Sequence, residues 1–362
     1  MATPGTLCFV IQSVDPYRFD FLNIFALPTG FEFRQRYDQR WVDPSLRDGA
    51  LAKLAGERVL VAFWDRATKR LVPVRFGQIS EATPVGKVAY FRYDLGEFVR
   101  YAASPDARRA FLQQFNNDLH NHHGENKIDS TGALELCVFR LAVPLPESAD
   151  ATDLTQWGHA LEEVASAECF ASIEFLKIIG LREHNDAAAS WASVADHSYK
   201  LKNNRTYQLR IMQFIPHANE ALPPAPHDLD LHAFEDQIRV LRRRQRAVGK
   251  YDVLNFVFRT SGFLQGGETS VEIVPVEKEG DLSARNQPLH IPIRVAGPTP
   301  LAKLARLGVF AASLGVAIVP RLLGRSDTWI TTVALVGLIL SLVGVQQFLS
   351  VFEPFRTLRS GK

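Results

Sequence analysis

The segment Thr328–Phe352, with the sequence TWITTVALVGLILSLVGVQQFLSVF, contains no charged residue. A helix needs about 20 consecutive apolar residues to cross the core of a bilayer, so this segment is long enough to span it. A second apolar segment, Leu304–Leu323, reaches spanning length if Arg306 and Arg321 extend their side chains to the two membrane surfaces. The sequence therefore predicts a C-terminal transmembrane hairpin within residues 298–362, followed by a short basic tail.

Basic residues flank the predicted hairpin on both sides and set its orientation. They are Lys303, Arg306, Arg356, Arg359 and Lys362. Because excess Lys and Arg stay on the cytoplasmic side of a membrane, both ends of the hairpin are expected to face the cytoplasm. Residues 1–13 lack the basic and long apolar regions of a secretory signal. We therefore expect a multi-pass protein of the cell inner membrane, with the lipid bilayer as its partner and both termini cytoplasmic.

Small residues recur along both predicted spans. They are Gly308, Ala312 and Gly315 in the first span, and Gly337, Ser341 and Gly344 in the second. Small side chains let membrane helices approach closely, so these positions are candidate packing contacts. The contacts would form either between the two spans of one chain or between protomers, which leaves a homo-oligomer open.

Length and composition bound the remainder of the chain. Its 362 residues allow about two soluble domains beside the membrane segment. The 41 basic and 39 acidic residues nearly balance, so the whole protein lacks the strongly basic character of many nucleic-acid-binding proteins. The 24 phenylalanines favour β-rich cores. Three widely spaced cysteines, Cys8, Cys137 and Cys169, indicate buried thiols in a reducing compartment.

Residues 1–145 are predicted to form a β-rich N-terminal domain. Its expected strands include Phe19–Ala26 and Phe31–Tyr37, which flank a turn containing Pro and Gly and would pair as a hairpin. One helix is expected to start at Ser104 and Pro105, because Ser is a good N-cap and Pro suits the first helical position.

A helical connector is predicted over residues 146–197. Apolar residues recur at every third or fourth position from Leu154 to Leu176, which is typical of an amphipathic helix. The apolar end of this run, Phe170–Leu181, is equally consistent with a strand.

Residues 198–297 are predicted to form a second β domain. Its short alternating strands, separated by turns, favour an immunoglobulin-like sandwich. The stretch Leu229–Val248 is expected to be an inserted basic helix, because its apolar residues would form one stripe and its arginines the remaining surface. The predicted fold class is thus a mainly β (α+β) soluble part with an immunoglobulin-like sandwich, plus the C-terminal transmembrane hairpin.

The first candidate site is the polar loop expected after the N-terminal helix. It contains His120, His122, His123 and Glu125, whose imidazole and carboxylate groups suit zinc or another divalent ion. The letters resemble the His-Asn-His nuclease motif only in a tripeptide, without the spacing of that motif. The alternative is a solvated loop without a metal.

The second candidate site is the predicted strand that holds Arg34, Arg36 and Tyr37. Arg34 and Arg36 point to the same face, because side chains alternate along a strand. Two guanidinium groups on one face suit a phosphate or a carboxylate, so a bound anion is one hypothesis. A solvated sheet face is the other.

The third candidate site is an arginine cluster that includes Arg239, Arg242, Arg243 and Arg246. A cluster of this kind contacts anionic lipid head groups, nucleic acid or a phosphorylated small molecule. The alternative is a solvated helix face, partly paired with acidic residues one or two turns earlier.

Three function classes remain open at this stage. The leading hypothesis is a non-enzymatic membrane-anchored protein whose cytoplasmic domains bind a partner or ligand; its sharper form is an oligomeric membrane-perturbing effector of a bacterial antiviral defence system. The second is a membrane-tethered metal-dependent hydrolase or nuclease that uses His120–Glu125. The third is a scaffold that binds anionic lipid or nucleic acid. No cofactor is expected, since the sequence lacks phosphate-loop, dinucleotide-binding and nucleophile-elbow motifs.

Overall fold

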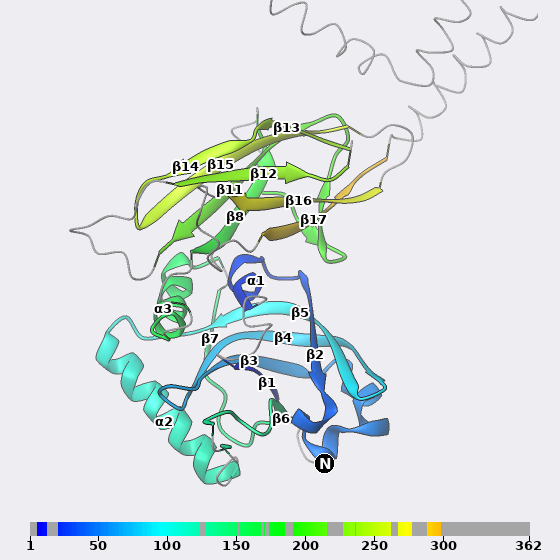
Figure 1. Ribbon diagram of the computed structural model, residues 1–362. Helices are drawn as coiled ribbons and strands as arrows, with labels where there is room; N and C mark the ends of the chain where they lie inside the picture. The colour runs from blue at the N-terminus through cyan, green and yellow to red at the C-terminus, as the bar shows by residue number, and fades with distance from the viewer. Residues whose placement is uncertain are drawn as a thin grey trace, which may run out of the picture.

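The structure, a computed structural model, is mostly β. It describes residues 6–12, 21–123, 128–129, 131–150, 152–167, 170, 174–184, 191–215, 227–235, 237–261, 267–276 and 288–297. Within these ranges one seven-stranded sheet forms the N-terminal part, and sheets of four and six strands form the C-terminal part. Figure 1 shows the two parts one above the other, with a short helix between them.

The N-terminal sheet has the strand order β2-β5-β4-β3-β1-β6, and β7 pairs with β5. Its strands are β1 (Leu7–Gln12), β2 (Glu32–Asp38), β3 (Arg58–Asp65), β4 (Arg70–Val85), β5 (Val88–Val99), β6 (Val138–Arg140) and β7 (Ser148–Ala149). β1 runs parallel to β3, whereas the other pairings are antiparallel. β2 therefore forms one edge of the sheet. Short 3-10 turns at Gln39–Trp41, Pro44–Leu46 and Asp48–Leu54 connect β2 to β3.

In the described ranges, three α-helices accompany the N-terminal sheet. They are α1 (Phe21–Ala26), α2 (Pro105–His123) and α3 (Leu154–Ala165). α3 starts where the Asp153 carboxylate accepts hydrogen bonds from the backbone N–H groups of Thr155 and Gln156, which satisfies two donors at the helix N-terminus. α1 lies between the N-terminal sheet and the C-terminal sheets (Figure 1).

The C-terminal part contains the remaining strands. They are β8 (Phe175–Glu183), β9 (Val194–Ala195), β10 (Ser198–Leu201), β11 (Thr206–Phe214), β12 (His227–Ala233), β13 (Ile238–Arg242), β14 (Arg244–Ala247), β15 (Tyr251–Thr260), β16 (Gly267–Pro275) and β17 (Leu289–Val295). One sheet has the order β13-β15-β11-β8, and the other has the order β14-β12-β16-β17-β10-β9. Between β13 and β14 the chain crosses from the four-stranded sheet to the six-stranded sheet. The order β8-β11-β15-β13 beside β12-β16-β17 corresponds to the two sheets of an immunoglobulin-like sandwich.

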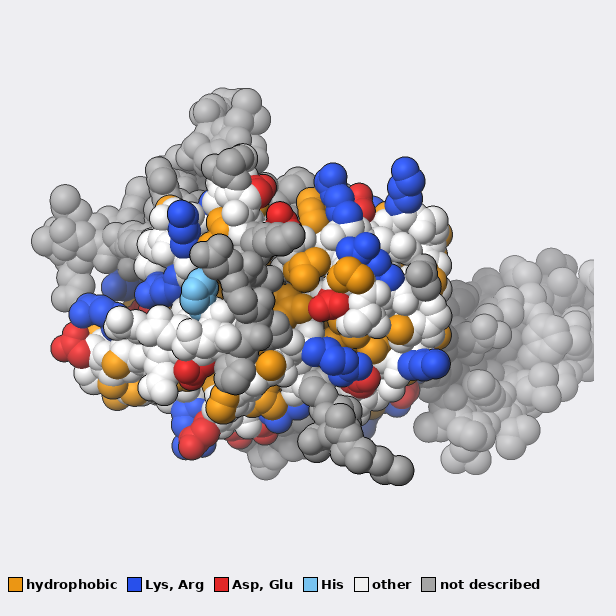
Figure 2. All heavy atoms as spheres, turned by 90° about the horizontal axis from the view of Figure 1, so that it is seen from below, with side chains coloured by type: hydrophobic (Ala, Val, Ile, Leu, Met, Phe, Trp, Pro, Cys, Tyr) orange, Lys and Arg blue, Asp and Glu red, His pale blue; other side chains and the backbone are white. Residues whose placement is uncertain are grey.

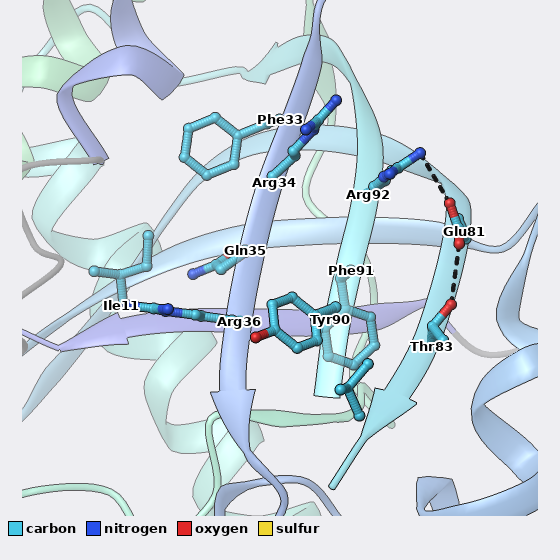
Figure 3. A pocket seen from close by; sticks show the side chains of 11 residues that line it. Ile11, Phe33, Arg34, Gln35, Arg36, Glu81, Thr83, Tyr90, Phe91 and Arg92 are labelled. Atoms are coloured by element: carbon cyan, nitrogen blue, oxygen red, sulfur yellow. Dashed lines mark hydrogen bonds and ion pairs between the residues drawn. The ribbon is translucent and has the colours of Figure 1, made fainter. Parts of the chain in front are cut away.

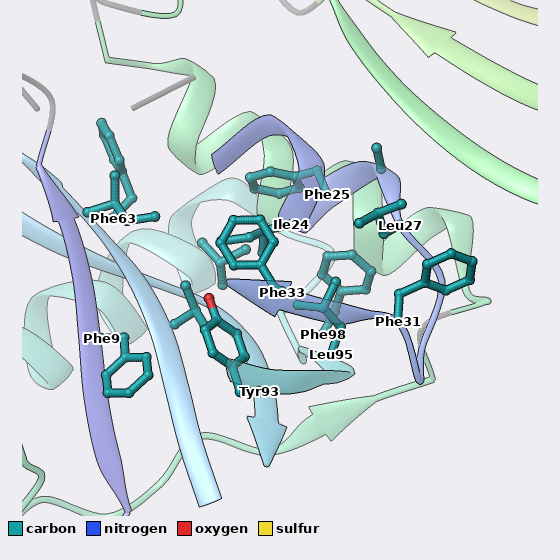
Figure 4. Packing of buried hydrophobic residues seen from close by; sticks show 14 of the residues in the cluster. Phe9, Ile24, Phe25, Leu27, Phe31, Phe33, Phe63, Tyr93, Leu95 and Phe98 are labelled. Atoms are coloured by element: carbon teal, nitrogen blue, oxygen red, sulfur yellow. The ribbon is translucent and has the colours of Figure 1, made fainter. Parts of the chain in front are cut away.

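Aromatic residues fill the core and link the two parts of the molecule (Figure 4). The ring of Phe9 lies 4.7 Å from that of Phe91 inside the N-terminal part. Phe25 of α1 contacts Phe175 of β8 edge to face, with ring centres 5.8 Å apart. Because such pairs bury large apolar areas, the two parts pack against each other through α1.

The membrane prediction is corrected by the described structure. The helices in the described ranges do not include one that is both long and apolar enough to span a membrane. The longest, α2, has 19 residues but carries charged and polar side chains along its length. The predicted spans, about 304–323 and 328–352, lie outside the described residues. The fold class with a transmembrane hairpin, and the multi-pass inner-membrane location derived from it, are therefore not supported.

Two local predictions are also wrong. Phe21–Ala26 is helical, and β2 pairs with β5 instead of forming the expected hairpin with that segment. The expected helix over Leu229–Val248 consists of β12, β13 and β14. Pairing with neighbouring strands overrides the local helical pattern in this stretch, as tertiary context often does.

Candidate functional site

A groove with a volume of about 560 Å³ opens beside the edge strand β2. Side chains from β1, β2, β4 and β5 line it (Figure 3). They are Ile11, Phe33, Arg34, Gln35, Arg36, Glu81, Thr83, Val85, Tyr90, Phe91 and Arg92. Because the β-sheet fixes these strands, the groove has a largely preformed shape.

Two arginines lie directly opposite each other at the groove. The antiparallel register places Arg34 of β2 opposite Arg92 of β5. The backbone bond from Leu95 N to the Phe31 carbonyl shows that the odd-numbered positions of β2 exchange hydrogen bonds with β5. Arg34 and Arg92 therefore form a non-hydrogen-bonded pair, in which cross-strand side chains approach most closely. Figure 3 shows both side chains extending to the same side of the strands.

Carboxylates balance part of this positive charge. Glu32 lies 2.6 Å from the Arg34 Nε atom, and Glu81 lies 3.0 Å from an Arg92 nitrogen. Glu81 also accepts a hydrogen bond from the Thr83 hydroxyl at 3.1 Å. The side chains of Arg34 and Arg92 are 72% and 47% exposed, so solvent screens both ion pairs and each contributes little to stability. A ligand anion can therefore compete for these guanidinium groups.

Apolar surface lies next to the charged groups. Tyr90 and Val85 are 41% and 58% exposed, although both are large apolar side chains on strands. Tyr90 lies opposite Arg36 in the register of β2 and β5, and opposite Thr83 in that of β4 and β5. The groove thus presents an aromatic ring beside guanidinium groups and a hydroxyl.

The lining suits binding better than covalent catalysis. Its described residues include no His, Cys, Ser or Lys, and its one carboxylate, Glu81, is already held by Arg92 and Thr83. A nucleophile, a base and an orienting group are therefore not assembled by these side chains. The available chemistry is recognition of negative charge and of a flat apolar group.

The structure brings together part of the second predicted site. Arg34 and Arg36 both line the groove, as their shared strand face indicates. Tyr37 points to the opposite face, where it is 2% exposed and its hydroxyl donates a hydrogen bond to the Val10 carbonyl at 3.2 Å.

Sequence reasoning did not find the other half of the groove. Tyr90 and Arg92 come from β5, and Glu81 and Thr83 come from β4. The alternation of residues 87–93 already places Tyr90 and Arg92 on one strand face. That signal did not reveal which strand would lie alongside.

Most side chains of the predicted metal site are not among those that the structure describes. α2 extends to His123, so the histidines follow one another on its last turns instead of forming a loop. His120 is exposed, whereas the side chains of His122, His123 and Glu125 are not among those described. Elsewhere in the described part of the chain, no group of three or more His, Cys, Asp and Glu residues could hold a metal ion. The metal prediction stays untested.

The arginine cluster of the third predicted site lies on strands. Arg243 and Arg244 both contact the Asp230 carboxylate, at 3.2 Å and 2.8 Å. These contacts lower the pKa of Asp230, with the hydrogen bond from Arg244 as the main cause. Arg239, Arg242 and Arg246 are exposed. The cluster is therefore divided between a structural ion-pair group and outward cations.

The predicted helix-packing residues are not part of the described structure. They are Gly308, Ala312, Gly315, Gly337, Ser341 and Gly344.

On the described surface seen from below Figure 1, hydrophobic side chains gather in a group bordered by Lys and Arg (Figure 2). Mixed apolar and basic surface is therefore present at the N-terminal end of the molecule.

Comparisons with known proteins add no family. No family model matches the chain. No curated protein matches it either. One similar solved structure is a Bacteroides ovatus GH5 xyloglucanase in complex with a XXXG heptasaccharide, with 11% identity and a TM-score of 0.18 over 30% of this chain and 19% of that chain. This chain thus spans less than a fifth of that enzyme, and so low a similarity supports no inference about fold or activity.

Proposed function

We propose that this chain is a binding protein, and that the groove beside β2 holds a ligand that joins an anionic group to a flat apolar body. The observation that carries the proposal is the direct opposition of Arg34 and Arg92 across two strands. Like charges in this position destabilise a sheet by roughly 0.2–1 kcal/mol. A bound anion would convert the repulsion into charge-assisted hydrogen bonds, which are among the stronger polar contacts in proteins.

The size and the apolar part of the groove support the same proposal. Its volume of about 560 Å³ falls within the usual range of small-molecule sites, about 300–1,000 Å³. The exposed ring of Tyr90 offers a surface for stacking a flat group beside the guanidinium groups. Arg36 supplies a third cation to the lining. The expected ligand is therefore an aromatic or similarly flat acid.

A pair of fluorescent probes tests the charge and the apolar body separately. 8-Anilinonaphthalene-1-sulfonate has both features, whereas N-phenyl-1-naphthylamine has the same apolar body without the sulfonate. Binding of each probe is measured for the wild-type chain, for the double variant R34Q/R92Q and for the control variant R100Q. Arg100 is a suitable control because it is an exposed arginine that follows the end of β5 and does not line the groove; it contacts Glu147 at 3.8 Å and the Ser148 carbonyl at 3.3 Å.

The double variant is expected to bind the sulfonate probe at least about tenfold more weakly, which corresponds to about 1.4 kcal/mol. Its affinity for the neutral probe is expected to change less than about twofold, because the apolar surface remains. R100Q is expected to match the wild-type chain with both probes. Equal sulfonate affinity in R34Q/R92Q and the wild-type chain would overturn the proposal, and so would an equal loss in R100Q.

A further inference from the structure

A second basic surface lies on the outward face of the four-stranded sheet β13-β15-β11-β8. Its residues belong to the C-terminal part of the molecule, whereas the groove belongs to the N-terminal sheet. The register places Gln208 of β11 opposite Arg182 of β8, and Arg210 opposite both Gly180 and Asn255. The alternate positions of β11 and β15, such as Leu209 and Phe256, are fully buried in the sandwich. The polar set therefore points away from the core.

Positive charge on this face is not neutralised locally. The outward positions described on β8 from Gly180 to Arg182, on β11 and on β15 contain no Asp or Glu. Arg239 of β13 adds a further cation at the edge of the same sheet. Among the described residues, no carboxylate lies within ion-pair distance of Arg182, Arg210 or Arg239. The face thus has a net positive charge that attracts an anionic partner.

A tryptophan lies on this basic face. Trp191 is 44% exposed and rests against the backbone of Gly180, where an added Cβ would lie 2.8 Å from the Trp191 Cδ2 atom. The Arg182 guanidinium lies 5.6 Å from the centre of the indole ring. The sheet therefore supports one part of the ring and leaves the rest open for stacking.

Hydrogen bonds fix the orientation of the polar groups beside Trp191. Arg182 donates to Gln208 Oε1 at 3.3 Å, and Gln208 Nε2 donates to Asn255 Oδ1 at 2.7 Å. These bonds use the acceptor oxygens of the two amides and leave donors on the surface. The buried Nε atom of Arg210, next to this chain of bonds, has no hydrogen-bond partner. An acceptor-rich, anionic partner matches this set of donors.

We infer that this face, defined as Arg182, Arg210, Arg239, Trp191, Gln208 and Asn255, binds single-stranded nucleic acid. Phosphates would provide the negatively charged partners that these arginines do not find among the described carboxylates. An unstacked base can lie on the open part of the Trp191 ring. A double helix keeps its bases stacked inside, so it would use the arginines but not the tryptophan. The presence of an exposed ring among unpaired cations therefore favours a single strand over a duplex and over a polyanion without bases.

The test is fluorescence anisotropy with a fluorescein-labelled oligothymidylate of about twenty nucleotides, titrated with the full chain at several NaCl concentrations. The variants are R182Q/R210Q, R239Q, W191A and W191F. R109Q serves as the control, because Arg109 lies on α2, away from this face, and its exposed side chain pairs with Asp106 at 3.1 Å. Unlabelled polyglutamate is the competitor that has charge but no bases.

The wild-type chain is expected to bind with an affinity that falls as salt rises. R182Q/R210Q should weaken binding at least about tenfold and reduce the slope of log K against log salt by about 1.4, since each phosphate contact contributes about 0.7. R239Q should weaken binding less and reduce the slope by about 0.7. W191A should weaken binding about fivefold or more without changing the slope, and W191F should restore most of the loss. R109Q should match the wild-type chain.

Three results would overturn the inference. One is the absence of oligothymidylate binding at low salt. Another is equal affinity of the wild-type chain, R182Q/R210Q and W191A. The third is equal competition by polyglutamate together with unchanged binding in W191A, which would identify a general polyanion surface. The groove beside β2 is not needed for any of these outcomes, so the two proposals succeed or fail separately.

Discussion

The guanidinium of Arg75 lies 4.6 Å from the centre of the Phe98 ring, inside the junction between the N-terminal sheet and the C-terminal sheets. The Nζ atom of Lys177, from β8, lies 4.8 Å from the centre of the same ring. Two buried basic side chains thus share one aromatic ring where the two parts of the molecule meet. Cation–π contacts of this kind are strongest when water is excluded.

Arg75 is expected to hold α1 in place. Its side chain is fully buried and donates hydrogen bonds to the carbonyls of Ile24 at 2.6 Å, Leu27 at 2.7 Å and Gly96 at 2.8 Å. R75M would leave these buried acceptors unpaired, so the free energy of unfolding should fall by about 3 kcal/mol or more. R75K should lose less, because an ammonium reaches some of the same acceptors. Urea unfolding measures both, and a loss below about 1 kcal/mol in R75M would contradict the assigned role.

Lys177 is expected to make stability depend on pH. Burial lowers the pKa of Lys177 well below its usual value, with the nearby charge of Arg75 as a smaller cause. Between this lowered pKa and about 10.5, the unfolded chain binds a proton that the folded chain does not, so stability rises with pH by at most about 1.4 kcal/mol per unit. K177M lacks this contribution. Urea unfolding at pH 7, 8 and 9 should therefore show a steeper rise for the wild-type chain than for K177M. Parallel pH curves would show that Lys177 is not perturbed.

Arg108 and Arg109 are adjacent on α2 but should differ strongly in their effects. Arg108 is 5% exposed and contacts Glu162 at 2.8 Å and Glu163 at 3.0 Å, which ties α2 to α3. R108A should therefore lower the free energy of unfolding by about 2–3 kcal/mol. Arg109 is exposed and pairs only with Asp106, so R109A should change it by less than about 0.5 kcal/mol. Similar losses in both variants would show that α2 is not held to α3 through Arg108.

Gly180 is expected to seat Trp191. A Cβ at this position would overlap the indole ring, so G180A should push the ring off the sheet. Because Trp191 is already partly exposed, it can move outward and the free energy of unfolding should fall by less than about 1 kcal/mol. Acrylamide quenching of tryptophan fluorescence should increase relative to the wild-type chain, and the same substitution in a W191F background should show no increase. Unchanged quenching in G180A would contradict this placement of the ring.

Local sequence signals predicted the elements that depend on neighbouring residues. α2 begins at Pro105, as the Ser-Pro start signal indicates. The apolar repeat that was expected to form a helix from Leu154 coincides at its start with α3, which covers Leu154–Ala165. These features follow from periodicity and capping, which a single sequence contains.

The inserted helix was mispredicted because the same residues fit two patterns. Ile238 is buried, but Leu241, Phe234 and Val248 are exposed, so the apolar stripe of the expected helix does not face the core. In the register of β13 with β15, Leu241 lies at a bulge. Bulges depend on the partner strand and leave little trace in the sequence of one segment.

The sequence predicted the β2 side of the groove but not the β5 side, for a similar reason. Arg34 and Arg36 share a face through simple strand alternation. Arg92, however, reaches Arg34 only because β2 pairs with β5. The sequence pattern favoured a hairpin with Phe19–Ala26 instead, since short connections are common between neighbouring strands. The pairing of β2 with β5, which are far apart in the sequence, therefore brings the two halves of the groove together. Local sequence patterns do not contain information about this pairing.

The measurement that tests the central proposal most directly is backbone amide chemical-shift mapping during titration with 8-anilinonaphthalene-1-sulfonate. We predict that the largest shifts at saturation occur at residues 34–36 of β2 and residues 90–92 of β5. R34Q/R92Q should remove these shifts. Shifts confined to other parts of the molecule, or none at saturating probe, would show that the groove beside β2 is not the binding site.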